Sequence, residues 1–126
     1  MSDLWAKVDD AAEEARILQR SGMTNGAVSR SYSACFTAAR ALVIQRLGAE
    51  ESDYRRHAAV LRRFSELFIK TGEIETELSR GLRLLFEDRA DADYADQRST
   101  RDEALEALAF MERFLAAVKP LRRIAP

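Results

Sequence analysis

Apolar residues recur at intervals of three and four along most of the chain, which is the spacing of an α-helix that buries one face. The first helix predicted from this spacing runs from about Asp3 to Gln19, and the second runs from Thr24 or Asn25 to Leu47. The second stripe is accompanied by a face of alanines, so this helix is expected to be central and packed on two sides. No segment alternates apolar and polar residues as a half-buried strand does. The pattern predicts an all-α fold.

A third helix is predicted to begin within residues 52–56 and to reach Lys70, where the tight turn Thr71-Gly72 follows. So short a connection forces the third and fourth helices to lie antiparallel as neighbours. The start of one helix should therefore lie beside the end of the other. We expect His57 to lie near the range from Phe86 to Arg89.

The fourth stripe is predicted to end near Asp88 or Arg89, because nearly every second residue beyond it is an aspartate, whose side chain competes for its own backbone. An acidic loop is expected from there to Arg98. The fifth helix is expected to be capped by Ser99 or Thr100. Helices with mostly short connections predict an up-and-down antiparallel bundle of four to five helices.

The chain has the size of one domain, with 126 residues, and is predicted to be a single domain over 1–126. Its core is placed at about 3–118, with a short tail at 119–126 that contains Pro120, where the last helix is expected to stop. A hydrophobic content of 47% with 33% charged residues excludes a disordered chain. The formal net charge of −1 provides no overall field that would attract nucleic acid or a membrane, so any such binding depends on local clusters.

The single cysteine, Cys35, excludes a disulfide within the chain and makes a cytoplasmic location the expected one. It falls within the second apolar stripe and is expected to be a small buried hydrophobe rather than a nucleophile. No apolar run is long enough to span a membrane, and the start of the chain lacks the pattern of a secretory signal. A soluble protein without a membrane partner is expected.

The antiparallel third and fourth helices bring titratable and basic side chains to one end of the predicted bundle. The set comprises Arg46, Arg55, Arg56, His57, Arg89, Asp93, Tyr94 and Arg98. Histidine, with an unperturbed pKa of about 6.5, can act as acid or base near neutral pH, and arginine forks suit phosphate oxygens. The set therefore suits phosphate binding or phosphodiester cleavage. Alternatively, the segment is a solvated loop, His57 caps the third helix, and the arginines pair with Asp88, Asp91, Asp93 and Asp96.

Other site types lack their required residues. Asp91-Ala92-Asp93 resembles the start of a calcium loop, but the required glycine and the closing glutamate are missing. One cysteine and one histidine cannot make a Cys/His metal cluster, and no glycine pair has the spacing of a phosphate-cradling loop. Neither a metal nor a cofactor is expected.

Segments in a fixed order resemble the HEPN domains (higher eukaryotes and prokaryotes nucleotide-binding), and in particular their small stand-alone bacterial and archaeal branch. They are the alanine-rich helix Ser29–Leu42, Arg56-His57 within Arg56–Phe64, Lys70-Thr71-Gly72, and Arg89-x3-Asp93-Tyr94. The resemblance extends from about Asp9 to Val118.

The resemblance implies a four- or five-helix bundle that forms homodimers. Many family members are metal-independent ribonucleases, often toxins whose antitoxin is a minimal nucleotidyltransferase. Their active site is an arginine followed four to six residues later by a histidine, and in several toxins a tyrosine just after it is modified with AMP. Arg89 matches the arginine and Tyr94 lies close to the tyrosine position, whereas no histidine follows Arg89 in this chain.

The resemblance thus implies a toxin-type or toxin-derived protein that binds RNA, as a ribonuclease or without cleavage, beside a nucleotidyltransferase. The candidate catalytic residues are Arg89, Tyr94 and His57, and the candidate ligand-binding residues are Arg56, Asp93 and Arg98. Two alternatives stay open. One is a catalytically silent module that binds a nucleotide or acts as an adaptor for the nucleotidyltransferase, and the other is a purely structural dimer.

Overall fold

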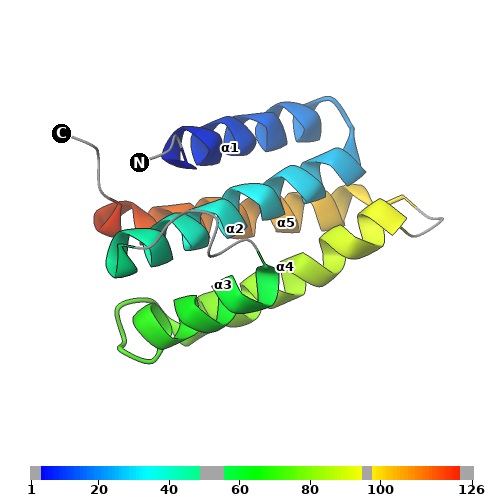
Figure 1. The fold of residues 1–126 in the computed structure, drawn as a ribbon. Helices are drawn as coiled ribbons and strands as arrows, with labels where there is room; N and C mark the ends of the chain where they lie inside the picture. The colour runs from blue at the N-terminus through cyan, green and yellow to red at the C-terminus, as the bar shows by residue number, and fades with distance from the viewer. Residues whose placement is uncertain (1–3, 49–55, 95–97, 123–126) are drawn as a thin grey trace.

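The computed structural model describes residues 4–48, 56–94 and 98–122, with the side chains of all of these except residues 88–94. The described chain is helical and contains no strand, which confirms the predicted all-α bundle (Figure 1). Its elements are α1 (Leu4–Arg20), α2 (Thr24–Leu47), α3 (His57–Phe64), the π-helix η2 (Ser65–Ile69), α4 (Thr76–Tyr94), α5 (Arg101–Val118) and the short 3-10 helix η3 (Lys119–Leu121). No helix in the described ranges is long and apolar enough to cross a membrane.

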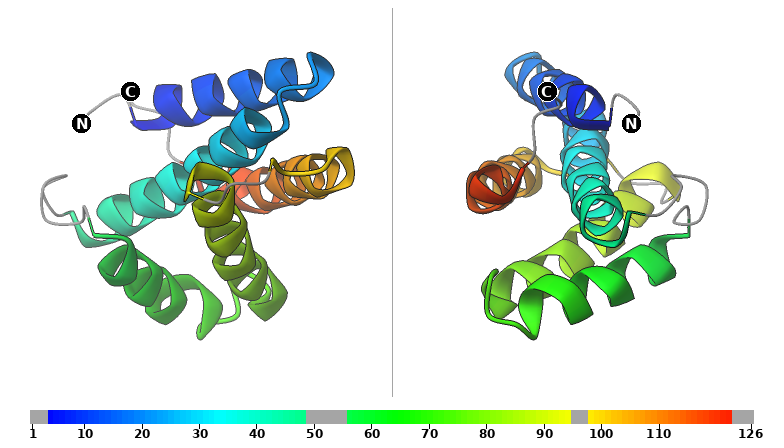
Figure 2. Two further views of the ribbon diagram at one scale, coloured as in Figure 1. Left: turned by 90° about the vertical axis from the view of Figure 1, so that its right-hand side faces the viewer. Right: turned by 60° about the vertical axis from the view of Figure 1, so that its left-hand side comes forward.

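The helix α2 lies at the centre of the bundle and packs against α1, α3, α4 and α5 (Figures 1 and 2). Its alanines Ala34, Ala38 and Ala41 are fully buried, and α1 contributes buried alanines of its own. Small side chains let helix backbones approach closely, and the α1–α2 pair is the most extensive in the fold. The prediction of a central second helix packed on two sides is confirmed.

The helix α4 is longer than predicted. Instead of ending near Asp88 or Arg89, it continues to Tyr94, so the acidic segment is mostly helix rather than loop. The reason is one of propensity. Ala90 and Ala92 alternate with the aspartates, and alanine is the strongest helix former, whereas each aspartate costs under about 1 kcal/mol. The helix-propensity cost of the aspartates is therefore too small to end a helix that is stabilised by packing against the core.

The start of α5 is fixed by a capping box at Thr100, one of the two predicted caps. The Thr100 hydroxyl accepts a hydrogen bond from the Glu103 backbone N–H at 3.0 Å, and the Glu103 carboxylate accepts one from the Thr100 N–H at 2.7 Å. The neighbouring Ser99 N–H donates to Oδ1 of Asn25 at 2.6 Å. This bond joins the start of α5 to the start of α2.

Candidate functional site

The imidazole of His57 lies among aromatic rings from two other helices. His57 is the first residue of α3 and is half-buried. Its ring centroid lies 4.2 Å from that of Phe36 and 5.5 Å from that of Tyr32, both on α2, and 5.3 Å from that of Phe86 on α4. The predicted proximity of His57 to Phe86 is therefore confirmed. The short turn at Thr71-Gly72 sets this pairing, and Gly72 adopts the left-handed φ of +83° that the turn requires.

The orientation of the imidazole is fixed by a hydrogen bond to Tyr32. The Tyr32 hydroxyl lies 3.2 Å from Nδ1 of His57, and the imidazole tautomer decides which group donates. Tyr32 is only 2% exposed, so the contact is shielded from solvent on the α2 side. His57 does not cap α3, because the N-cap residue is Arg56 and no side-chain capping bond is made there. The imidazole is thus held by packing and by Tyr32.

The exposed arginines predicted for the site stand at different distances from the imidazole. Arg56 is exposed and directly precedes His57. Arg98 is also exposed and precedes Ser99, which is bonded to Asn25 at the start of α2. Asn25 lies seven residues before Tyr32, or about 10 Å along the helix axis. The site is therefore extended, with Arg56 beside the imidazole and Arg98 toward the start of α2.

Of the remaining predicted residues, Arg55 lies outside the described residues. Arg89, Asp93 and Tyr94 lie in the last turns of α4, where the structure describes the backbone alone. Position 89 follows Phe86 by three residues, about 4.5 Å along the helix axis, and position 93 follows it by seven. At these spacings both positions share the side of the helix that carries Phe86. The helix thus places the backbone of Arg89 within one turn of the ring that contacts His57. The predicted pairing of arginines with Asp88, Asp91, Asp93 and Asp96 lies outside the described side chains.

Arg46 does not belong to this site, which corrects the prediction that the end of α2 joins it. The Arg46 guanidinium donates two hydrogen bonds to Glu73, at 2.9 and 3.1 Å, and stacks 4.5 Å from the ring centroid of Phe68. Both contacts lie at the turn between η2 and α4, the opposite end of that hairpin from His57. These hydrogen bonds lower the pKa of Glu73. The prediction was wrong because α3 begins beside the middle of α2 rather than beside its end.

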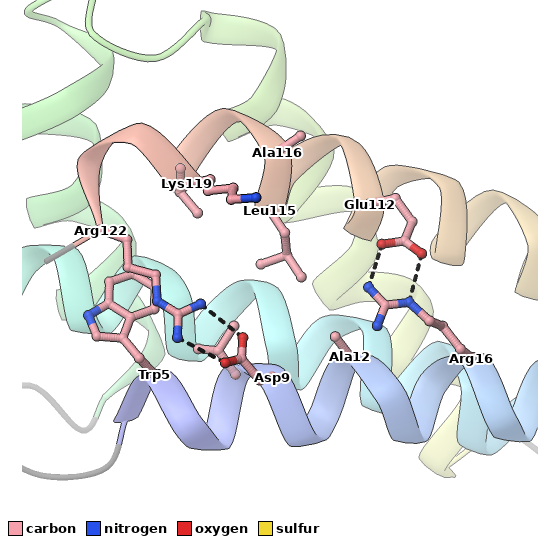
Figure 3. Close-up of a pocket in the computed structure, with 11 residues that line it drawn as sticks. Trp5, Asp9, Ala12, Arg16, Glu112, Leu115, Ala116, Lys119 and Arg122 are labelled. Carbon is pink, nitrogen blue, oxygen red and sulfur yellow. Dashed lines mark hydrogen bonds and ion pairs between the residues drawn. The ribbon is translucent and has the colours of Figure 1, made fainter. Parts of the chain in front are cut away.

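A cavity of about 630 Å³ lies between α1 and α5, away from the His57 site (Figure 3). An ion pair bridges it at each end: Arg16 bonds both oxygens of Glu112, at 2.7 and 2.8 Å, and Arg122 bonds both oxygens of Asp9, at 2.9 Å each. The Arg122 guanidinium also lies 4.9 Å from the ring centroid of Trp5. No local sequence pattern indicates these pairs, because their partners are about a hundred residues apart. Both guanidinium groups are satisfied by carboxylates, so one pair joins α1 to α5 and the other joins α1 to Arg122, directly after η3.

The side chains that the structure describes do not assemble a metal site. They contain no group of three or more histidine, cysteine, aspartate or glutamate residues placed to hold a metal ion. The chemistry available at the His57 site is that of an imidazole, a phenol hydroxyl and exposed guanidinium groups.

Comparison with known proteins gives a consistent result. Residues 1–121 match the HEPN domain family. A Thermotoga maritima protein named "UPF0332 protein" is 26% identical over 119 residues, covering 90% of this chain and 87% of its own length. Two Methanocaldococcus jannaschii proteins are named "Putative toxin MJ0605" and "Putative toxin MJ0142". The first is 31% identical, and the match covers 94% of this chain and 91% of the relative's length. The second is 30% identical, and the match covers 86% of this chain and 71% of the relative's length.

No solved structure matches the chain at a significant level. The family match spans nearly all of the described helices, and one archaeal relative aligns over most of both chains. The chain belongs to the HEPN domain family.

Proposed function

We propose that this chain is the toxin-type component of a HEPN–nucleotidyltransferase pair and that it binds and cleaves RNA where α3 meets α4. The family membership and the names of the two archaeal relatives support a toxin-like role. The observation that carries the proposal is the position of His57, whose ring contacts Phe86 one helical turn before the backbone of Arg89. An imidazole can serve as the base and an arginine as the phosphate ligand of one phosphodiester.

The proposed reaction is an internal transfer within the RNA. His57 accepts the proton of a ribose 2′-hydroxyl while its oxygen forms a bond to the adjacent phosphorus. The bond from phosphorus to the 5′-oxygen of the next nucleotide breaks, leaving a 2′,3′-cyclic phosphate, and the departing oxygen takes a proton from Tyr94. Arg89 binds a non-bridging oxygen, and Arg56, Asp93 and Arg98 position the strand. The site is composite, because its histidine comes from α3 instead of following Arg89 on α4.

A cleavage assay tests this reaction. Purified protein would be incubated with mixed-sequence RNA in EDTA, and the products would be examined for cyclic-phosphate ends. The test variants are Arg89→Ala and His57→Gln, and the matched control is Arg80→Ala, an exposed arginine on the same helix. Cleavage by the wild type and the control that both test variants lose supports the proposal. If RNA stays intact, or if the test variants cleave like the control, the enzyme proposal fails.

The second candidate is a catalytically silent module that binds a nucleotide or presents a substrate to the partner enzyme. It is favoured by the enclosure of His57, whose ring is half-buried among aromatic rings. A ligand that binds only the folded state raises the melting temperature with its concentration. Nucleotide titrations followed by thermal unfolding therefore separate the two candidates: stabilisation without cleavage supports the silent module.

The proposed assembly has two parts, a homodimer and a complex with a minimal nucleotidyltransferase. Both rest on the family resemblance. Light scattering coupled to gel filtration would measure the mass of the protein in solution. A mass equal to one chain at high protein concentration contradicts the homodimer. Co-expression with the nucleotidyltransferase would test the complex.

A further inference from the structure

A smaller cavity, of about 250 Å³, lies between the α3–η2 segment and α4, further along the same helix pair from His57 and Phe86. It is lined by Leu61, Arg62, Ser65, Glu66, Lys70, Ser79 and Arg83. We call it the basic cleft. The figures show the two segments that form it, in green and yellow-green, on the side of α2 opposite α1 (Figures 1 and 2).

The cations of the basic cleft are uncompensated by the rest of the described chain. Arg62, Lys70 and Arg83 are exposed, and none of them forms an ion pair or a side-chain hydrogen bond with a described residue. The single carboxylate of the cleft belongs to Glu66, which already pairs with Arg63 at 3.4 Å. The cleft therefore has an excess of positive charge that a ligand anion can neutralise.

The π-helix gives the basic cleft its shape. The Lys70 backbone N–H donates to the Ser65 carbonyl at 2.9 Å, an i to i+5 bond. In an α-helix, residues five apart point to different sides, whereas this bond places Lys70 one turn beyond Ser65, so that both residues line the cleft. Single π-helical turns are frequent at functional sites. Across the cleft, Ser79 and Arg83 are four residues apart on α4 and share one face.

The basic cleft and the His57 site lie along the same two helices, about one turn apart. Along α3, Leu61 follows His57 by four residues, and Ser65 follows after four more. Along α4, Arg83 precedes Phe86 by three residues and Ser79 by seven. These are the spacings of neighbours on one helix face. A ligand strand bound at the His57 site therefore has to extend by about one turn along both helices to reach the cleft that Arg62 and Arg83 line.

We propose that the basic cleft binds a phosphate group of the single-stranded RNA that occupies the His57 site, so this inference rests on the proposed function. Arg62 and Arg83 offer guanidinium forks that match phosphate oxygens, Lys70 adds a point charge, and the hydroxyls of Ser65 and Ser79 can donate hydrogen bonds. The volume favours one group of a longer chain. The cleft has a volume of about 250 Å³, whereas typical small-molecule pockets have roughly 300–1,000 Å³. The cleft is therefore too small to enclose a whole nucleotide.

The test measures binding of a short fluorescein-labelled single-stranded RNA by anisotropy over a series of salt concentrations. The test variant is Arg62→Ala/Arg83→Ala. The matched control is Lys7→Ala/Lys119→Ala, which removes the same charge from exposed positions on α1 and at the end of α5. Far-ultraviolet circular dichroism and thermal unfolding would show that both variants fold. The affinity of the test variant should fall roughly threefold to tenfold relative to the control. The slope of log K against log salt should decrease by about 0.7 for each phosphate that the variant no longer neutralises.

The outcomes separate the inference from the proposed function. If the wild type binds RNA and the test variant has the affinity and salt slope of the control, the basic cleft is not an RNA site and the proposed function is unaffected. If the wild type binds no RNA while remaining folded, both the proposed function and the inference fail. A reduced affinity with a reduced salt slope in the test variant alone supports the inference.

Discussion

The Tyr32 hydroxyl lies 3.2 Å from Nδ1 of His57 and joins the middle of α2 to the first residue of α3. The two residues are separated by 25 positions in the sequence, and the contact is reinforced by the rings of Phe36 and Phe86. Because α2 contacts every other long helix, this hydrogen bond adds to the apolar packing that holds the α3–α4 pair on the core of the bundle. The candidate site is centred on a single imidazole and the rings around it.

The first prediction concerns the magnetic environment of His57, whose imidazole signals are unambiguous because the chain has one histidine. Nearby aromatic rings should shift its C–H proton resonances from their values in an unfolded chain. Replacing Phe86 by leucine should move these resonances, because the two ring centroids lie 5.3 Å apart. Phe110→Leu, at a half-buried phenylalanine on α5, is the control and should leave them in place. Identical His57 spectra in the wild type and Phe86→Leu would contradict the described packing.

Elements specified by local signals could be predicted from the sequence. The helix α2 begins at Thr24 and ends at Leu47 as the apolar stripe predicts, and Gly48 follows with a left-handed φ of +64°. Thr100 followed by Glu103 is a recognisable capping box. In these cases the residues that determine the structure are neighbours in the sequence.

Features that depend on distant residues could not be predicted in the same way. The second apolar stripe includes Leu47 at its end, yet this side chain is 39% exposed. The Asp9–Arg122 pair joins residues 113 positions apart. The aromatic rings around His57 were unforeseen apart from Phe86, because spacing along α3 does not show which turn of α2 the helix meets. The π-helix was also missed, since its apolar spacing is compatible with an ordinary α-helix.

The second prediction concerns Gly81, where α4 passes close to α5. A Cβ atom built on Gly81 would overlap the Phe110 ring, with Cδ1 at 2.8 Å and Cζ at 2.9 Å. Gly81→Ala gains about 1 kcal/mol of helix propensity, but the overlap forces the ring or the helices apart. The free energy of unfolding should fall by about 1–2 kcal/mol net.

The double variant Gly81→Ala/Phe110→Leu is the control for this effect. Removing the ring relieves the overlap, so alanine at position 81 should be neutral or stabilising relative to Phe110→Leu alone. Urea unfolding of the four proteins in the cycle gives the coupling free energy. A coupling close to zero would show that α4 and α5 do not meet at these residues.

The third prediction is that the Cys35 thiol is inert in the folded protein. Its side chain is fully buried on α2, and burial raises the pKa of the thiol above its ordinary value, so little thiolate is present. A thiol reagent should modify Cys35 only as fast as the bundle opens, and denaturant should abolish the protection. The matched control is Cys35→Ala/Ala109→Cys, which moves the thiol to an exposed position on α5. Equal rates for the two thiols under native conditions would contradict the burial.

The fourth prediction is that the two ion pairs that anchor α1, Arg16–Glu112 and Arg122–Asp9, make stability depend on acid pH. Hydrogen bonds from Arg122 and Arg16 lower the folded-state pKa values of Asp9 and Glu112, respectively. A carboxyl group whose pKa is lower when folded stabilises the protein fully above its unfolded pKa of about 4, and this contribution is lost as the pH falls through the folded pKa. Because both pairs are partly exposed, each should contribute at most about 1 kcal/mol.

Asp9→Asn/Glu112→Gln should therefore be less stable than the wild type at neutral pH, and the difference should shrink on acidification. Asp10→Asn/Glu106→Gln, at exposed carboxylates outside these pairs, serves as the control. A difference between wild type and test variant that is the same at neutral and acid pH would show that the pairs do not stabilise the fold.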